Sequence, residues 1–134
     1  MTPVTDEALL SGFEAGRLDA FHHADHVHVA WIYLSRLPFV EALDAFTRHL
    51  KQFAAAAGKP DLYHETITVA YLLLIQDRIA RRGRGRTWDD FAGANSDLLV
   101  WRPSILKQYY SDELLASKTA RQAFVWPDKM TTCI

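Results

Sequence analysis

The chain has 134 residues, of which 49% are hydrophobic, 12% aromatic and 23% charged, and its formal net charge is -1. This length and composition predict one globular domain over residues 1–134 and exclude a collagen-like or disordered chain. The near-zero charge excludes a general electrostatic attraction to nucleic acid or acidic membranes, so such binding would need a local patch.

The cysteine content and the apolar runs indicate a compartment. Cys133 has no partner thiol in the chain, which excludes an intrachain disulfide framework and suits a reducing environment. Residues 1–7 lack the basic and apolar regions of a signal peptide. The longest apolar run, residues 69–75, is far shorter than the roughly 20 residues that span a bilayer. We therefore expect a cytoplasmic protein that is neither exported nor inserted into a membrane.

Three helices are predicted in the first part of the chain. The first covers residues 6–13, after Thr5 as the expected N-cap. The second covers residues 21–37 and ends at Pro38, because proline lacks an amide donor and restricts the residue before it. The third, residues 39–57, carries apolar residues at alternating spacings of three and four, which is typical of an amphipathic surface helix.

One long apolar helix and several short helices are predicted for the rest. Between about residues 61 and 80, apolar side chains surround the whole helix, which favours a position at the centre of the fold. Thr87, Ser111 and Ser117 are expected N-caps of short helices that pack over this central helix. No alternating pattern of strand length is present. The sequence therefore predicts an all-α compact helical bundle.

Four histidines lie within seven residues of the second expected helix: His22, His23, His26 and His28. His23 and His26 are three residues apart and share the core-facing side, whereas His28 is expected to point to solvent. A helix that begins later than expected would place His22 at its cap, or make His22 the inward histidine in place of His23.

A second polar cluster opens the central helix. His64 shares one stripe with Thr68 and Tyr71, and Glu65 lies beside them. Polar groups on an apolar helix cost free energy unless they are hydrogen-bonded or hold a ligand. Imidazoles from two neighbouring helices are suitable ligands for Zn²⁺ or Fe²⁺. We therefore predict one divalent metal ion, zinc or iron, bound by histidines of both helices: His23, His26 and His64, with His22 as the alternative.

Such a metal site predicts a small metal-dependent enzyme. The metal would polarise a substrate oxygen, or activate water or dioxygen, for hydrolysis or oxidation of a small molecule. Glu65 is expected to be a fourth ligand or the general base. Hydroxyl groups near the histidines are candidates for orienting the substrate: Tyr33, Tyr63, Thr68 and Tyr71.

Other interpretations of the same sequence remain open. The histidines would also fit a buried hydrogen-bond network in a non-catalytic helical module that binds a small hydrophobic ligand or a partner helix. Trp101 and other aromatic residues of the C-terminal third either line a pocket or lock the short helices onto the core. Residues 81–86 are rich in arginine, but acidic neighbours favour a solvated turn over a nucleic-acid patch. The exposed aromatic residues decide neither for nor against a homodimer.

Overall fold

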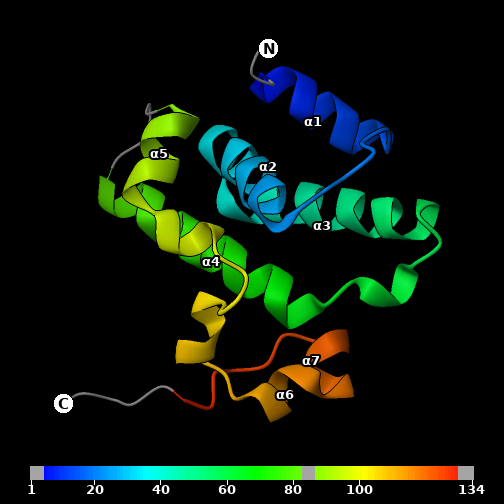
Figure 1. Cartoon of the computed structure of the whole chain (residues 1–134), viewed down its shortest axis with the longest axis vertical. Helices are drawn as coiled ribbons and strands as arrows, with labels where there is room; N and C mark the ends of the chain where they lie inside the picture. Colours follow the sequence, from blue (N-terminus) through cyan, green and yellow to red (C-terminus); the bar gives the residue numbers. More distant parts are fainter. Residues whose placement is uncertain (1–4, 83–86, 130–134) are drawn as a thin grey trace.

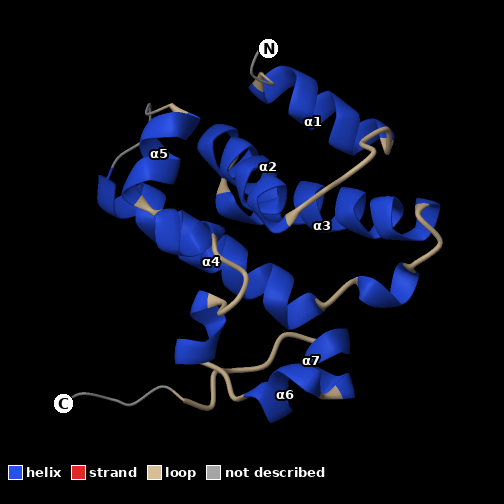
Figure 2. Cartoon of the chain, in the orientation of Figure 1, coloured by secondary structure: helices blue, strands red, loops and turns tan. Residues whose placement is uncertain are grey.

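A computed structural model describes residues 5–82 and 87–129, and this part of the chain is built from helices (Figure 1). No strand forms within these residues, where Figure 2 shows only helices and loops. The predicted all-α bundle is confirmed. In chain order the helices are α1 (Asp6–Ala15), α2 (His23–Arg36), α3 (Phe39–Ala56), the 3-10 helix η1 (Pro60–Leu62), α4 (Glu65–Arg82), α5 (Trp88–Ala94), η2 (Ser96–Leu99), η3 (Ile105–Gln108), α6 (Asp112–Ala116) and α7 (Lys118–Gln122).

The helix ends agree with the local signals in the sequence. The Thr5 hydroxyl accepts a hydrogen bond from the Ala8 amide at 3.1 Å and caps α1. Gly16 ends α1 with a φ of 68°, a left-handed conformation that glycine adopts without steric cost. Ser111 and Ser117 cap α6 and α7 in the same way as Thr5 caps α1. Side chains that accept hydrogen bonds from free backbone amides therefore fix the starts of these three helices.

The centre of the molecule is formed by α2 and α4. In α2, every residue from Val27 to Leu34 is buried, the longest such run in the described residues. α4 packs against α2, α3 and α7, as expected of a central helix, but it is not buried on all sides, since Leu73 is 44% exposed. The apolar residues around the helix predicted for residues 61–80 suggested that it would be the most buried helix. In the structure α2 is buried more completely, because no described helix covers the side of α4 that carries Leu73.

His28 is buried, and the expectation that it points to solvent was wrong. Its Nε2 atom lies 2.7 Å from Oδ1 of Asp6 in α1. Its ring stacks on that of Trp88 in α5, with centroids 4.1 Å apart and an interplanar angle of 5°. A helix before α2 in the sequence and one well after it thus cover this face, which the periodicity of α2 alone could not reveal.

The C-terminal segment folds back over α4, as the sequence predicted. Figure 1 shows α6 and α7 beside the first turns of α4. The Thr66 hydroxyl donates to the Ala123 carbonyl at 2.8 Å, and the Tyr110 hydroxyl donates to the Val125 carbonyl at 2.8 Å. These hydrogen bonds tie the chain after α7 to the core.

Two features of the surface relate to the sequence predictions. Residues 83–86 of the arginine-rich segment and Cys133 lie outside the described residues. Before that segment, Arg78 pairs with Asp97 at 2.7 Å and Arg81 pairs with Asp77 at 2.9 Å.

Among the described helices, none has the length and apolar character needed to traverse a bilayer.

Candidate functional site

A cavity of about 510 Å³ lies between α2, α3 and α4. Small-molecule pockets typically measure roughly 300 to 1,000 Å³. Several lining residues are exposed and mark the mouth: Ala57, Lys59, Leu62, Trp101 and Arg121. The interior is lined by apolar side chains of three helices: Val27 and Ala30 of α2, Phe46, Leu50 and Phe53 of α3, and Leu72 and Ile75 of α4.

Three of the four histidines predicted to hold a metal line this one cavity. His23 and His26 reach it from α2, and His64 reaches it from the residue before α4. His22 does not line the cavity; it is the exposed N-cap of α2, and its amide donates to Asp25 Oδ2 at 3.0 Å. Of the two alternatives left open by the sequence, His23 is therefore the inward histidine.

The ring of His64 is fixed in one neutral tautomer by two backbone groups. Nε2 lies 2.7 Å from the carbonyl oxygen of Leu115, which only accepts, so Nε2 carries the proton. Nδ1 accepts a hydrogen bond from the Ile67 amide at 3.1 Å. Burial lowers the pKa of His64, and the positive charge of Arg121 lowers it further. A metal ion would have to displace one of these two hydrogen bonds to bind the ring.

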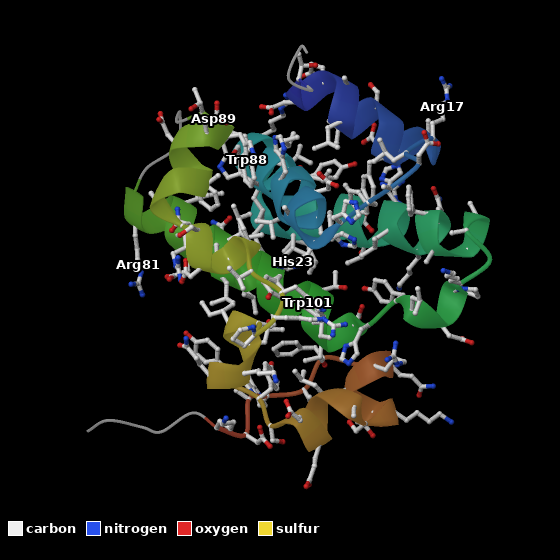
Figure 3. All side chains as sticks on the ribbon, in the orientation of Figure 1. Arg17, His23, Arg81, Trp88, Asp89 and Trp101 are labelled. Atoms are coloured by element: carbon white, nitrogen blue, oxygen red, sulfur yellow. The ribbon has the colours of Figure 1, made fainter. Side chains whose placement is uncertain are left out.

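His23 is held by one backbone hydrogen bond and two aromatic neighbours. Its Nε2 donates to the Leu98 carbonyl at 2.8 Å, which leaves Nδ1 as an acceptor. Its ring centroid is 4.8 Å from that of Tyr71 and 5.1 Å from that of Trp101. Figure 3 labels His23 and Trp101 in the same region of the molecule. Burial lowers the pKa of His23, so the imidazole is neutral near pH 7.

His26 differs from the other two because it has no hydrogen bond to a distant carbonyl among the described residues. Its ring stacks on that of Phe21, with centroids 4.1 Å apart, and it interacts with the Phe21 backbone. Burial first, and the nearby His23 second, lower the pKa of His26 to about 4. His26 therefore presents an uncharged imidazole to the cavity.

The residues expected to act beside a metal lie in different places. Thr68 and Tyr71 line the cavity, but the Thr68 hydroxyl donates to the His64 carbonyl at 2.7 Å and the Tyr71 hydroxyl shares a hydrogen bond of 2.6 Å with Ser104. Glu65 is not a lining residue; its carboxylate accepts a hydrogen bond from Tyr63, which does line the cavity. Glu65 thus contacts a residue of the cavity wall, Tyr63, but does not itself line the cavity.

Tyr33 lies apart from the cavity, on the side of α2 that faces α1 and α3. Its hydroxyl donates to Glu14 at 2.5 Å, and its ring stacks on that of His49 at an interplanar angle of 11°. Burial and the neighbouring Glu14 carboxylate raise the pKa of Tyr33. Tyr33 therefore connects three helices and does not contact the candidate site.

The positions and hydrogen bonds of the histidine and acidic side chains matter for the predicted metal site. Within residues 5–82 and 87–129, no three His, Cys, Asp or Glu side chains are grouped so that they could hold a metal ion. His23 and His64 each direct Nε2 to a carbonyl oxygen. Nδ1 of His23 is left for a metal while Nε2 keeps its carbonyl partner, whereas His64 would have to give up its hydrogen bond to Leu115 or to Ile67.

Three residues at the cavity mouth were not recognised as site residues in the sequence. Trp101 was open to two interpretations, and its ring packs against the His23 and Tyr71 rings at the mouth. Lys59 and Arg121 gave no signal, because Arg121 lies far from the other lining residues in the sequence and isolated basic residues are common on surfaces.

Comparison of the chain with protein-family models, with curated proteins and with solved structures finds no match. The chemistry of the residues that line the cavity is therefore the basis on which a function can be assigned. The cavity combines an apolar interior with a wall of neutral imidazole and hydroxyl groups, an arrangement suited to an organic molecule with one polar end.

Proposed function

We propose that this protein binds a small organic molecule in the cavity between α2, α3 and α4. The observation that carries the proposal is the cavity itself, about 510 Å³ in volume, with apolar side chains from three helices around it. Removing apolar ligand surface from water there would supply most of the binding free energy.

The histidine wall would orient the ligand. His26 is half-buried and has no hydrogen bond to a distant carbonyl among the described residues, and Nδ1 of His23 is an acceptor once Nε2 donates to Leu98. A polar ligand atom in contact with these nitrogens would gain a hydrogen bond that apolar side chains cannot offer. This accounts for two neutral imidazoles beside an apolar space without requiring a metal.

Cavity filling tests this proposal. Ala54 lines the cavity near the end of α3, whereas Ala55, the next residue, is exposed and does not line it. The neutral fluorescent probe phenylnaphthylamine should bind the native protein and become brighter in the apolar cavity. Ala54→Phe should weaken this binding by at least about tenfold, because the new ring occupies the space of the probe. Fluorescence titration gives both dissociation constants.

The matched control is Ala55→Phe, which adds the same ring to the same helix but outside the cavity. Its dissociation constant should stay within about twofold of the native value, since surface substitutions rarely change a buried site. A native protein that fails to bind the probe, or two variants with equal affinities, would contradict the proposal.

A metalloenzyme is the competing proposal, because His23, His26 and His64 all reach the same cavity. In that case His23 would bind the metal through Nδ1, His64 would exchange one of its two backbone hydrogen bonds for the metal, and Glu65 would act as a fourth ligand or as the base. Hydrolysis or oxidation of a small molecule would follow from the bound metal.

Metal analysis distinguishes the two proposals. The untagged protein, prepared without chelators, should contain near-stoichiometric zinc or iron if the metalloenzyme proposal is correct, and His64→Ala should lose it. A native protein that binds phenylnaphthylamine, contains no metal and does not take up added Zn²⁺ would support the organic-ligand proposal alone.

A further inference from the structure

We infer that the ligand of this cavity is an amphipathic organic anion whose acidic group lies at the mouth, between Lys59 and Arg121. This inference rests on the proposed function and adds the chemical class of the ligand. Its basis is the charge of the residues that line the cavity, together with the hydrogen-bond partners of Arg121.

The charged residues that line the cavity are all cations. Lys59 and Arg121 belong to the lining, and no Asp or Glu among the described residues does. Three acidic residues near the lining lie outside it: Glu65 accepts a hydrogen bond from Tyr63, Asp25 accepts one from the His22 amide, and Asp61 is exposed. A carboxylate, sulfonate or phosphate on the ligand would therefore meet positive charge without a competing negative wall.

Both cations border the same short segment, η1. Lys59 is its N-cap residue, and Arg121 reaches it from α7, where Nη1 donates to the carbonyl oxygens of Asp61 at 2.7 Å and Tyr63 at 3.3 Å. These bonds hold the guanidinium at the mouth and use only one of its nitrogens. Its remaining N–H donors make no hydrogen bond within residues 5–82 and 87–129, and a planar guanidinium binds carboxylates and sulfonates in a bidentate manner.

The partners of Arg121 set it apart from several other arginines. Within the described part of the chain, Arg36, Arg48, Arg78 and Arg81 each form an ion pair with a carboxylate. Arg121 instead bonds to two neutral carbonyl oxygens, so its charge is not neutralised by them. Arg121 and His64 both line the cavity, so this charge lies at the cavity wall.

The apolar part of the ligand would extend from the mouth toward α3 and α4. Tyr63, whose carbonyl accepts from Arg121, lines the cavity together with the apolar residues Leu62, Ile67 and Phe53. Free phosphate or chloride would gain the charge interaction at the mouth but none of this apolar contact. The site therefore favours an aromatic or aliphatic acid over an inorganic anion.

Two fluorescent probes of nearly the same shape test the inference. Anilinonaphthalene sulfonate carries an acidic group, and phenylnaphthylamine is its neutral counterpart. Arg121→Gln should weaken binding of the sulfonate by about tenfold, whereas the affinity of the neutral probe should change by less than about twofold. Lys59→Gln should act in the same direction without altering the hydrogen bonds of α7. Added salt should weaken binding of the sulfonate only.

Lys118→Gln is the matched control, because it removes one positive charge from α7 at an exposed residue outside the lining. Equal losses for the two probes in Arg121→Gln, or an equal loss of sulfonate binding in Lys118→Gln, would overturn the inference while leaving the proposed function intact. Sulfonate binding that persists in Ala54→Phe would place that probe elsewhere and also overturn it. A native protein that binds neither probe would overturn both proposals.

Discussion

The two faces of α2 use the same residue type in opposite ways. On the face covered by α1 and α5, His28 is hydrogen-bonded to Asp6 and stacked on Trp88. On the face toward α4, His26 is stacked on Phe21 and borders the cavity, with no distant carbonyl as partner among the described residues. The first histidine holds three helices together, whereas the second is held by the ring and backbone of Phe21 beside the cavity.

This difference between His28 and His26 bears on the proposed binding of a ligand in the cavity. A buried polar group with partners contributes to stability, whereas one without them lowers stability unless a ligand supplies the missing interaction. Burial lowers the pKa of His26 to about 4, which is the electrostatic sign of such a cost. In the proposed function, a ligand at the cavity face of α2 would supply an interaction that offsets this cost.

The largest expected effect separates the two histidines by stability. His28→Ala removes a buried hydrogen bond and an aromatic stack, and it should lower the free energy of unfolding by about 3 kcal/mol. His26→Ala removes one stack beside an existing cavity and should lower it by about 1 kcal/mol. Urea denaturation of both variants measures the two values. Equal losses, or a larger loss for His26→Ala, would contradict the assignment of the two faces.

The next effect concerns the pH dependence of stability. Because the pKa of His26 falls from 6.5 to about 4 on folding, the unfolded chain binds a proton there that the folded chain does not. The stability supported by the neutral ring is complete above pH 6.5 and declines as the pH falls toward 4. Between pH 7 and pH 5 the free energy of unfolding should drop by about 2 kcal/mol from His26 alone.

His26→Phe identifies the source of this pH dependence. Phenylalanine keeps a ring against Phe21 but cannot titrate, so the decline between pH 7 and pH 5 should become smaller. His23 and His64, whose pKa values are also lowered by burial, should account for what remains. Denaturant titrations across this range compare the slopes, and an unchanged slope in the variant would remove His26 from the explanation.

The smallest expected effect is at the start of α2. Asp25 accepts a hydrogen bond from the His22 amide at 3.0 Å, and Asp25→Ala should cost about 1 kcal/mol of stability. The exposed His22 side chain lies outside the cavity, so His22→Ala should change stability by less than about 0.5 kcal/mol and leave probe binding unchanged. A large effect of His22→Ala on probe binding would extend the site beyond its present wall.

Local sequence signals determined much of this protein. Caps such as Thr5, Ser111 and Ser117 set helix ends because they satisfy amides within their own turn, and this requires no knowledge of the rest of the chain. Helical spacing also placed His23 and His26 on one side of α2, where both line the cavity.

The tertiary structure decided what each group does. His28 is buried because α1 and α5 cover it, and those contacts join residues distant in the sequence. The same holds for Leu98 and Leu115, whose carbonyls engage His23 and His64, and for Arg121 at the mouth of the cavity. Periodicity reports the face of one helix, whereas the partner of a polar group depends on which other segment packs there, and that is set by the whole fold.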